Sequence, residues 1–189
     1  MQTSKIYLNE LAHLTELFNF FSSGRHLNRS ADAVLWHELE QQAEQYQHLF
    51  AKLGFELRID GRGFAWFHDD DANPNINKQS RQLALLLMVI FDHQADRGRS
   101  LGQFYQWMID NTLLDEVYEK HQELLDTEEL DQDALAKILD NAVRKGFAVQ
   151  ESNHWRLLPS VYRYLDHFEA ITEQTSGSNA SAYEEDESC

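Results

Sequence analysis

The feature that most constrains this fold is a unit of helix, glycine and hairpin that occurs twice in the chain. In the second copy, residues 134–145 repeat apolar side chains at i, i+3, i+4 and i+7, which predicts a helix with one apolar face. These side chains are Leu135, Ile138, Leu139 and Ala142. Gly146 is expected to end the helix in the left-handed conformation that glycine tolerates. Residues 147–159 contain two short apolar runs around a polar turn, which predicts a β-hairpin.

The first copy follows the same order. Residues 35–53 are predicted to be helical, Gly54 ends the helix, and residues 55–67 form a hairpin around a Gly-Arg-Gly turn. Gly54 aligns with Gly146, and a phenylalanine follows each glycine. Two copies of one supersecondary unit predict a mainly α fold with two small β-hairpins, arranged as tandem winged-helix domains.

Composition sets the expected domain boundaries. Residues 72–75 are Ala-Asn-Pro-Asn, which favours a turn. We therefore expect an N-terminal winged-helix domain at 1–72 and a C-terminal winged-helix domain at 73–171. Residues 172–189 are rich in Ser, Gly and Asn and then acidic, so they are expected to form a disordered tail.

Apolar periodicity predicts further helices outside the repeated unit. Residues 25–28 are expected to be an exposed connection, and Ser100 and Asn111-Thr112 are expected to cap helices. The longest apolar run, residues 83–91, is too short to cross a bilayer and predicts a buried core helix. The predicted helices are 8–21, 77–96, 101–109, the segment that follows Asn111-Thr112, and 161–171.

The charge balance excludes a protein that clamps DNA through its overall field. The formal net charge is −16, and without the last 21 residues, which hold six acidic groups, the chain still has 26 acidic and 16 basic residues. A nucleic-acid contact must therefore be local. Cys189 is the only cysteine, so a disulfide framework is excluded within one chain. The amino terminus is not typical of a signal peptide, which favours a cytoplasmic protein with no membrane contact.

Motifs for catalysis or metal binding are incomplete. His37 and Glu38 are followed by Gln41 where a zinc-protease helix needs a second histidine. Asp92, His93 and Asp96, and the acidic run at 69–71, are better explained as surface or capping groups. The chain contains neither a phosphate-binding glycine loop nor a nucleophile elbow. We therefore expect a non-enzyme with no metal and no cofactor.

Basic residues on the second unit are the candidate nucleic-acid-binding site. Lys137, Arg144 and Lys145 occupy the polar side of the predicted recognition helix, and Arg156 and Arg163 are close in sequence. So few cations predict weak, salt-dependent binding by the isolated chain. A solvated helix face of mixed charge explains the same residues equally well.

Several stretches together resemble the MukE/MksE proteins, small winged-helix subunits of bacterial condensin-like complexes. The resemblance extends from Leu8 to Ile171 and is closer to the shorter MksE branch, because the segment between the apolar helix and the second hairpin is compact. The stretches that carry it are residues 20–27, the Gly-Phe-Glu-Leu-Arg hairpin that ends in 64–67, the apolar helix from Leu83, the hairpin from 144–147 to 155–157, and residues 160–163.

The resemblance implies a homodimer that holds a kleisin subunit (MksF-like), which joins it to an SMC ATPase (MksB-like). It implies a nucleoid-associated scaffold that acts in chromosome organisation or plasmid defence and contributes to DNA capture within the complex. Arg144 matches the family's DNA-facing pattern most closely, beside Lys145 and Lys137. The alternative is a winged-helix DNA-binding transcription regulator, which requires a concentrated basic face.

Overall fold

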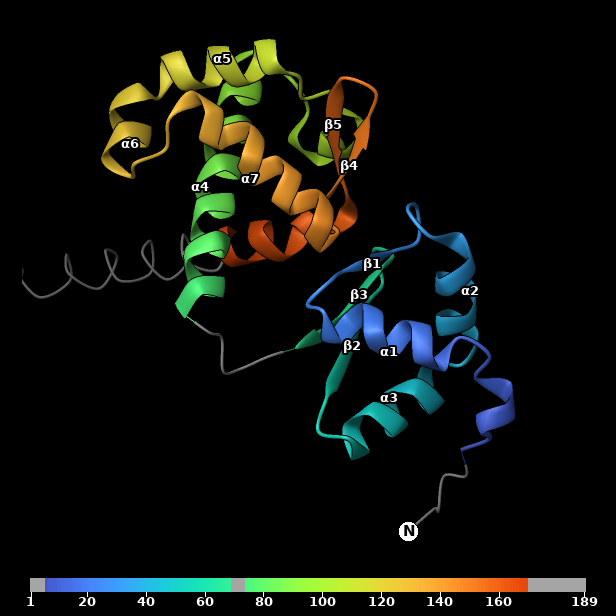
Figure 1. Cartoon of the computed structure of the whole chain (residues 1–189). Coiled ribbons are helices and arrows are strands. Elements are labelled where there is room, and N and C mark those ends of the chain that lie inside the picture. Colours follow the sequence, from blue (N-terminus) through green and yellow to red (C-terminus); the bar gives the residue numbers. More distant parts are fainter. Residues whose placement is uncertain (1–5, 69–73, 170–189) are drawn as a thin grey trace, which may run out of the picture.

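The computed structural model describes residues 6–68 and 74–169 of the chain, with side chains placed for 6–68 and 78–169 (Figure 1). The fold is mainly helical with two small antiparallel sheets, as predicted. Figure 1 shows two groups of elements, one built from residues up to 68 and one built from residue 74 onward. The predicted tail at 172–189 and the acidic run at 69–71 lie outside the described residues.

The first group surrounds a three-stranded sheet. The predicted helix at 8–21 is a 3₁₀ turn followed by a shorter α-helix, and Asp32 caps the next helix by accepting a hydrogen bond from the Leu35 N–H at 3.1 Å. The elements are η1 (Leu8–Glu10), α1 (Leu14–Ser22), β1 (Leu27–Asn28), α2 (Ala33–Gln41), α3 (Ala43–Lys52), β2 (Glu56–Asp60) and β3 (Phe64–His68).

The prediction of one helix over 35–53 is wrong, because the helix breaks at Gln42 into α2 and α3. A straight helix of that length would extend about 28 Å, at 1.5 Å per residue. The break allows both short helices to pack on one core. Trp36 and Leu39 of α2 and Tyr46 and Phe50 of α3 are buried in the same cluster.

Strand β1 was not predicted. Residues 25–28 were expected to be exposed, but Leu27 pairs with Ala65 and Asn28 with Phe64, so β1 covers the free edge of the β2–β3 hairpin. His26, Leu27 and Asn28 are all buried. The segment that was predicted to be an exposed connection therefore contains a buried strand at the junction of the two groups.

The second group is organised around α4, the predicted core helix. Ile109 exchanges both backbone hydrogen bonds with Trp155, at 2.9 and 2.7 Å, so the chain is extended there and the predicted helix at 101–109 is a shorter 3₁₀ segment. Asp110 caps α5 in place of Asn111-Thr112. The elements are α4 (Pro74–Asp96), η2 (Leu101–Gln106), α5 (Asn111–Lys120), α6 (Gln122–Thr127), α7 (Gln132–Lys145), β4 (Ala148–Glu151), β5 (His154–Leu157), η3 (Pro159–Val161) and a helix at 162–169.

Both predicted glycine stops and both hairpins are confirmed. Gly54 has a φ of +88° and Gly146 a φ of +79°. At Gly146 the Phe147 N–H returns to the Ala142 carbonyl at 2.8 Å, which completes the helix cap. Strands β2 and β3 pair antiparallel after Gly54, and β4 and β5 pair antiparallel after Gly146.

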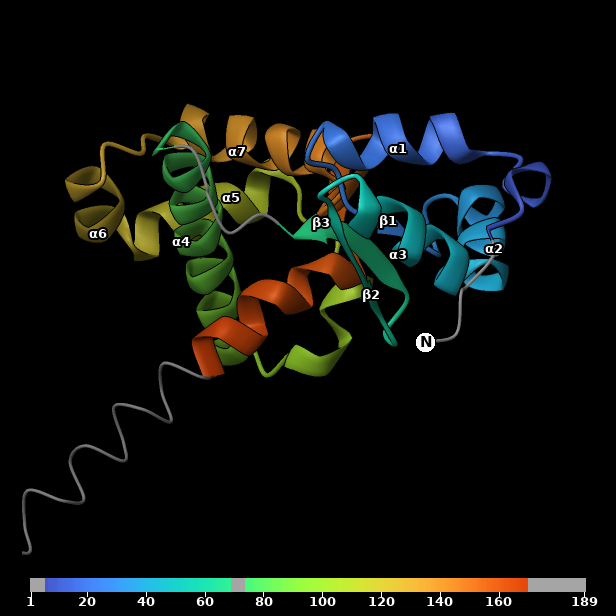
Figure 2. The ribbon, with the colours of Figure 1, turned by 90° about the horizontal axis from the view of Figure 1, so that it is seen from below.

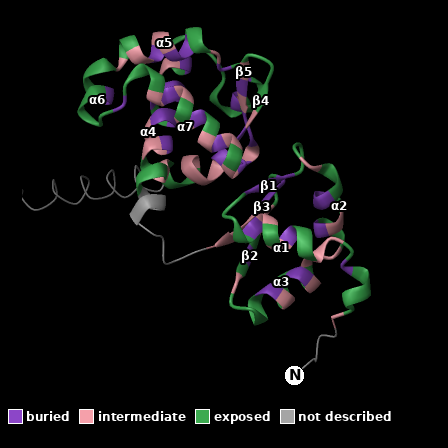
Figure 3. Ribbon diagram, in the orientation of Figure 1, coloured by how far each residue is buried: buried purple, intermediate pink, exposed green. Residues whose placement is uncertain are grey.

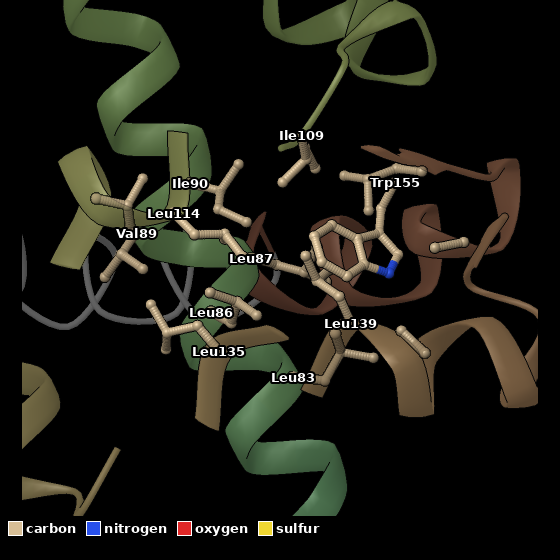
Figure 4. Packing of buried hydrophobic residues seen from close by; sticks show 14 of the residues in the cluster. Leu83, Leu86, Leu87, Val89, Ile90, Ile109, Leu114, Leu135, Leu139 and Trp155 are labelled. Carbon is tan, nitrogen blue, oxygen red and sulfur yellow. The ribbon is translucent and has the colours of Figure 1, made fainter. Parts of the chain in front are cut away.

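Buried apolar side chains form two clusters, one inside each group (Figure 3). The larger cluster lies where α4 and α7 meet the second hairpin (Figure 4). Each large apolar side chain that is fully buried contributes about 1.5–3 kcal/mol to folding. The larger cluster includes Leu83, Leu86, Leu87, Ile90, Ile109, Leu135, Leu139 and Trp155.

Candidate functional site

A groove of about 670 Å³ lies between α4, α7 and the helix at 162–169. These helices are green, orange and red in Figure 1, and Figure 2 shows helix 162–169 running from the side of the three-stranded sheet towards α4. Gly24, His26 and Phe67 reach the groove from the first group of elements. The volume falls within the range of about 300–1,000 Å³ that is usual for ligand pockets.

The groove is cationic in an acidic protein. Four basic side chains line it, and among its described lining residues none is Asp or Glu. The rest of the lining is largely apolar and includes Leu83, Ile138 and Phe147. The basic residues are Lys137, Arg144, Lys145 and Arg163. This lining suits an anionic ligand that also carries apolar surface.

Helix α7 presents two of these cations because of its periodicity. Its apolar stripe, Leu135, Leu139 and Ala142, is buried, whereas Lys137 and Arg144 are exposed seven residues apart, on one face. Within residues 6–68 and 74–169, neither Lys137 nor Arg144 forms an ion pair. Both charges are therefore available to a partner.

The other two predicted site residues are placed differently. Lys145 lines the groove, but its ammonium donates a hydrogen bond to the Ser23 carbonyl at 2.9 Å, which ties α7 to the end of α1. Arg156 is not among the residues that line the groove, and its Nε donates to Glu151 at 3.0 Å within the second hairpin. The structure brings Lys137, Arg144 and Lys145 together and leaves Arg156 apart.

His26 joins the two groups at the end of the groove. Its backbone N–H donates to the Lys145 carbonyl at 2.9 Å, and its Nδ1 lies 3.1 Å from the same oxygen. The Arg163 guanidinium donates to Nε2, and the imidazole centroid lies 4.2 Å from that of Phe147. A carbonyl only accepts and a guanidinium only donates. His26 must therefore be neutral, with its proton on Nδ1.

The electrostatics agree with that assignment. Burial, followed by the charge of Arg163, lowers the pKa of His26 from 6.5 to about 3. The Arg163 guanidinium also stacks 4.6 Å from the centroid of the Trp66 ring. Burial lowers the pKa of Arg163 as well.

A buried polar cluster reinforces this junction. The Asn28 Nδ2 donates to the Gly146 carbonyl at 2.8 Å, and the Ser160 N–H donates to the Asn28 Oδ1 at 3.1 Å. The Ser160 hydroxyl donates to the same Gly146 carbonyl at 2.6 Å. Sequence reasoning missed His26 and Asn28, because their partners lie about 120 residues away and give no local signal.

Arg62 forms a second link between the groups. Its guanidinium forms a bidentate pair with Asp166, at 2.8 and 2.5 Å, and stacks 4.5 Å from the centroid of Tyr162. The hydrogen bonds to Asp166 and Asp60 raise the pKa of Arg62. Arg62 therefore holds helix 162–169, one wall of the groove, against the turn of the first hairpin.

The carboxylates considered above as metal ligands, Asp92 and Asp96, form ion pairs within the fold. Lys120 donates to Asp92 at 2.5 Å and to Asp96 at 2.6 Å, which gives these carboxylates a role in pairing α4 with α5. Across the part of the chain that the structure describes, no three His, Cys, Asp or Glu side chains are grouped so as to hold a metal ion. Of the helices in that part, none is long and apolar enough to cross a membrane.

A groove lined by cations beside apolar side chains is typical of a surface that binds an anionic partner. The family model described as "Condensin complex protein MksE" matches residues 12–169, most of the chain. The chain therefore belongs to the MksE family, as the sequence resemblance predicted. No curated protein matches the chain.

Proposed function

We propose that this chain is a non-catalytic scaffold subunit of a bacterial condensin-like SMC complex. The match to the MksE family over residues 12–169 is the observation that carries the proposal. In the proposed complex, a homodimer of this chain holds an MksF-like kleisin, and the kleisin connects the homodimer to an MksB-like SMC ATPase. The complex acts on DNA in chromosome organisation or in plasmid defence.

Tandem winged-helix domains are part of the proposal. A helix, a glycine with positive φ and an antiparallel hairpin occur in that order at Gly54 and again at Gly146. A winged-helix domain uses this order of elements to present a helix beside a wing. The separate core cluster of each half supports two domains of this kind.

DNA held within the complex is the proposed contact for Lys137 and Arg144. Both are exposed on α7 and unpaired within the described chain, so they can meet phosphates without first breaking an ion pair. The net charge of −16 argues against the alternative, a regulator that binds DNA alone. Partner subunits must supply most of the favourable field.

The test uses the reconstituted complex with Lys137→Glu and Arg144→Glu combined. DNA capture is measured against salt concentration, and binding of the kleisin is measured by co-purification. Loss of two phosphate contacts should reduce the slope of log K against log salt by about 2. Kleisin binding should be unchanged.

The matched control is Lys52→Glu with Arg99→Glu, two exposed residues outside the groove, which makes the same change in net charge. It should leave DNA capture close to that of the unmodified complex. Equal losses in both double variants would show a general charge effect and refute a specific contact. A complex that does not assemble with the unmodified chain would refute the scaffold function itself.

A further inference from the structure

We infer that the acidic segment at 183–187 of this chain binds in the chain's own cationic groove. The segment is Tyr-Glu-Glu-Asp-Glu, with four consecutive acidic residues after one aromatic residue. The groove has the complementary composition, with basic side chains beside apolar ones. This contact would make the groove an internal binding site for the chain's own carboxyl-terminal segment.

The groove contains a partly buried cation, Arg163, that lacks an anionic partner in the described part of the chain. Arg163 is half-buried, and its polar partner is the neutral imidazole of His26 rather than a carboxylate. Within the described ranges Arg163 forms no ion pair. A partly buried charge normally has a charged partner, because removing it from water is costly. A carboxylate beside Arg163 would offset this cost.

The lining favours a peptide over nucleic acid inside the groove. Its volume of about 670 Å³ accommodates a few side chains, whereas a DNA duplex can only lie across its rim. Carboxylates of the segment can pair with Lys137 and Arg144 at the rim, and Tyr183 can cover the apolar lining near Leu83. Aromatic and acidic groups in one short segment match both kinds of surface.

The attachment point lets the acidic segment reach the groove of its own chain. Helix 162–169 contributes Arg163, Tyr164 and His167 to the groove, so the segment is tethered to one of its walls. The 14 residues from 169 to 183 span at most about 46 Å, at 3.3 Å per residue. A tether of this length gives an effective concentration on the order of millimolar, so even weak intrinsic affinity fills the groove.

The test places a nitroxide on Cys189, the only cysteine in the full chain, two residues beyond the acidic run. Amide signals of the ¹⁵N-labelled protein are compared with the nitroxide oxidised and reduced, at low ionic strength. We expect selective broadening of the residues that line the groove on α7 and on helix 162–169. Uniform broadening, or none at these residues, would overturn the inference.

Variants define what holds the segment. Lys137→Gln with Arg144→Gln should remove the broadening, whereas Lys52→Gln with Arg99→Gln, two exposed residues outside the groove, should keep it. Replacing all four acidic residues of 184–187 by their amides should also remove it, as should about 1 M salt, which shortens the Debye length to about 3 Å. Broadening that persists in the four-amide variant would contradict a charge-based contact.

A mixed sample separates one chain from two. Nitroxide-labelled chains without ¹⁵N are mixed with ¹⁵N chains without the nitroxide, and the inference predicts no broadening in this sample. Broadening there would show that the segment binds a second copy and would refute an internal contact. No DNA and no partner subunit is present, so these outcomes leave the proposed condensin function untouched.

Discussion

Protonation of His26 should weaken the junction between the two groups of elements. In the folded chain the imidazole is neutral, donates to the Lys145 carbonyl and accepts from Arg163. A second proton on the ring would remove the acceptor and place a cation against the guanidinium. Lowering the pH should therefore destabilise the protein through this one residue.

The size of the effect follows from the two pKa values. The pKa of His26 is about 3 in the folded chain and 6.5 as the reference for the unfolded chain. Between these values the unfolded chain binds one more proton, so the free energy of unfolding falls by about 1.4 kcal/mol per pH unit as the pH decreases. Above pH 6.5 the imidazole is largely neutral in both states, so His26 no longer lowers the free energy of unfolding. From pH 7 to pH 5 the loss is about 2 kcal/mol.

Urea unfolding at pH 7, 6 and 5, at one protein concentration, measures this effect in the unmodified chain and in His26→Asn. The variant should be less stable at pH 7 but should lose about 2 kcal/mol less than the unmodified chain on going to pH 5. His37→Asn, at an exposed histidine, should keep the full pH dependence. Parallel pH profiles for His26→Asn and the unmodified chain would refute the assignment of a neutral His26.

Three further predictions concern the repeat, the junction and the assembly. Gly146→Ala should lower the free energy of unfolding by at least about 3 kcal/mol, because a Cβ there would collide with the His26 carbonyl. Gly54 has open space around it, so Gly54→Ala should lower it by only about 1–2 kcal/mol, the cost of positive φ alone. Chemical denaturation compares the two variants, and equal losses would contradict the close contact at Gly146. Asn28→Ala should cost about 2 kcal/mol in the same assay, because it leaves the buried Ser160 N–H unpaired, and an unchanged midpoint would oppose this role. Light scattering of the isolated protein should give twice 22.1 kDa, and a monomer mass at micromolar concentrations would contradict the homodimer.

Features with local signals were predicted correctly from the sequence. The apolar period of α7, the glycine after it and the polar turn of the second hairpin each lie within a few residues. Features set by distant partners were missed. The bridge between Ile109 and Trp155 shortens the predicted helix at 101–109, and pairing with β3 converts residues 27 and 28 into a strand.

The same distinction applies to the site. Lys137 and Arg144 were identified because they occupy the polar face of one helix. Sequence proximity grouped Arg156 with them, but the hairpin carries its side chain to Glu151, outside the groove. The contribution of His26 and Arg163 depends on the packing of two distant segments. That packing has no signature in either segment alone.

The bonding of Asn28 has a consequence for synthesis of the chain. Its amide partners, Gly146 and Ser160, leave the ribosome 118 and 132 residues after it. Until then the amide must be solvated, since a polar group buried without partners is costly. The strands of the amino-terminal sheet can pair early, but the surface around Asn28 remains exposed to water until Gly146 and Ser160 have been synthesised. Docking of the two halves should therefore be a late step in folding, slowed by the long loop that it closes.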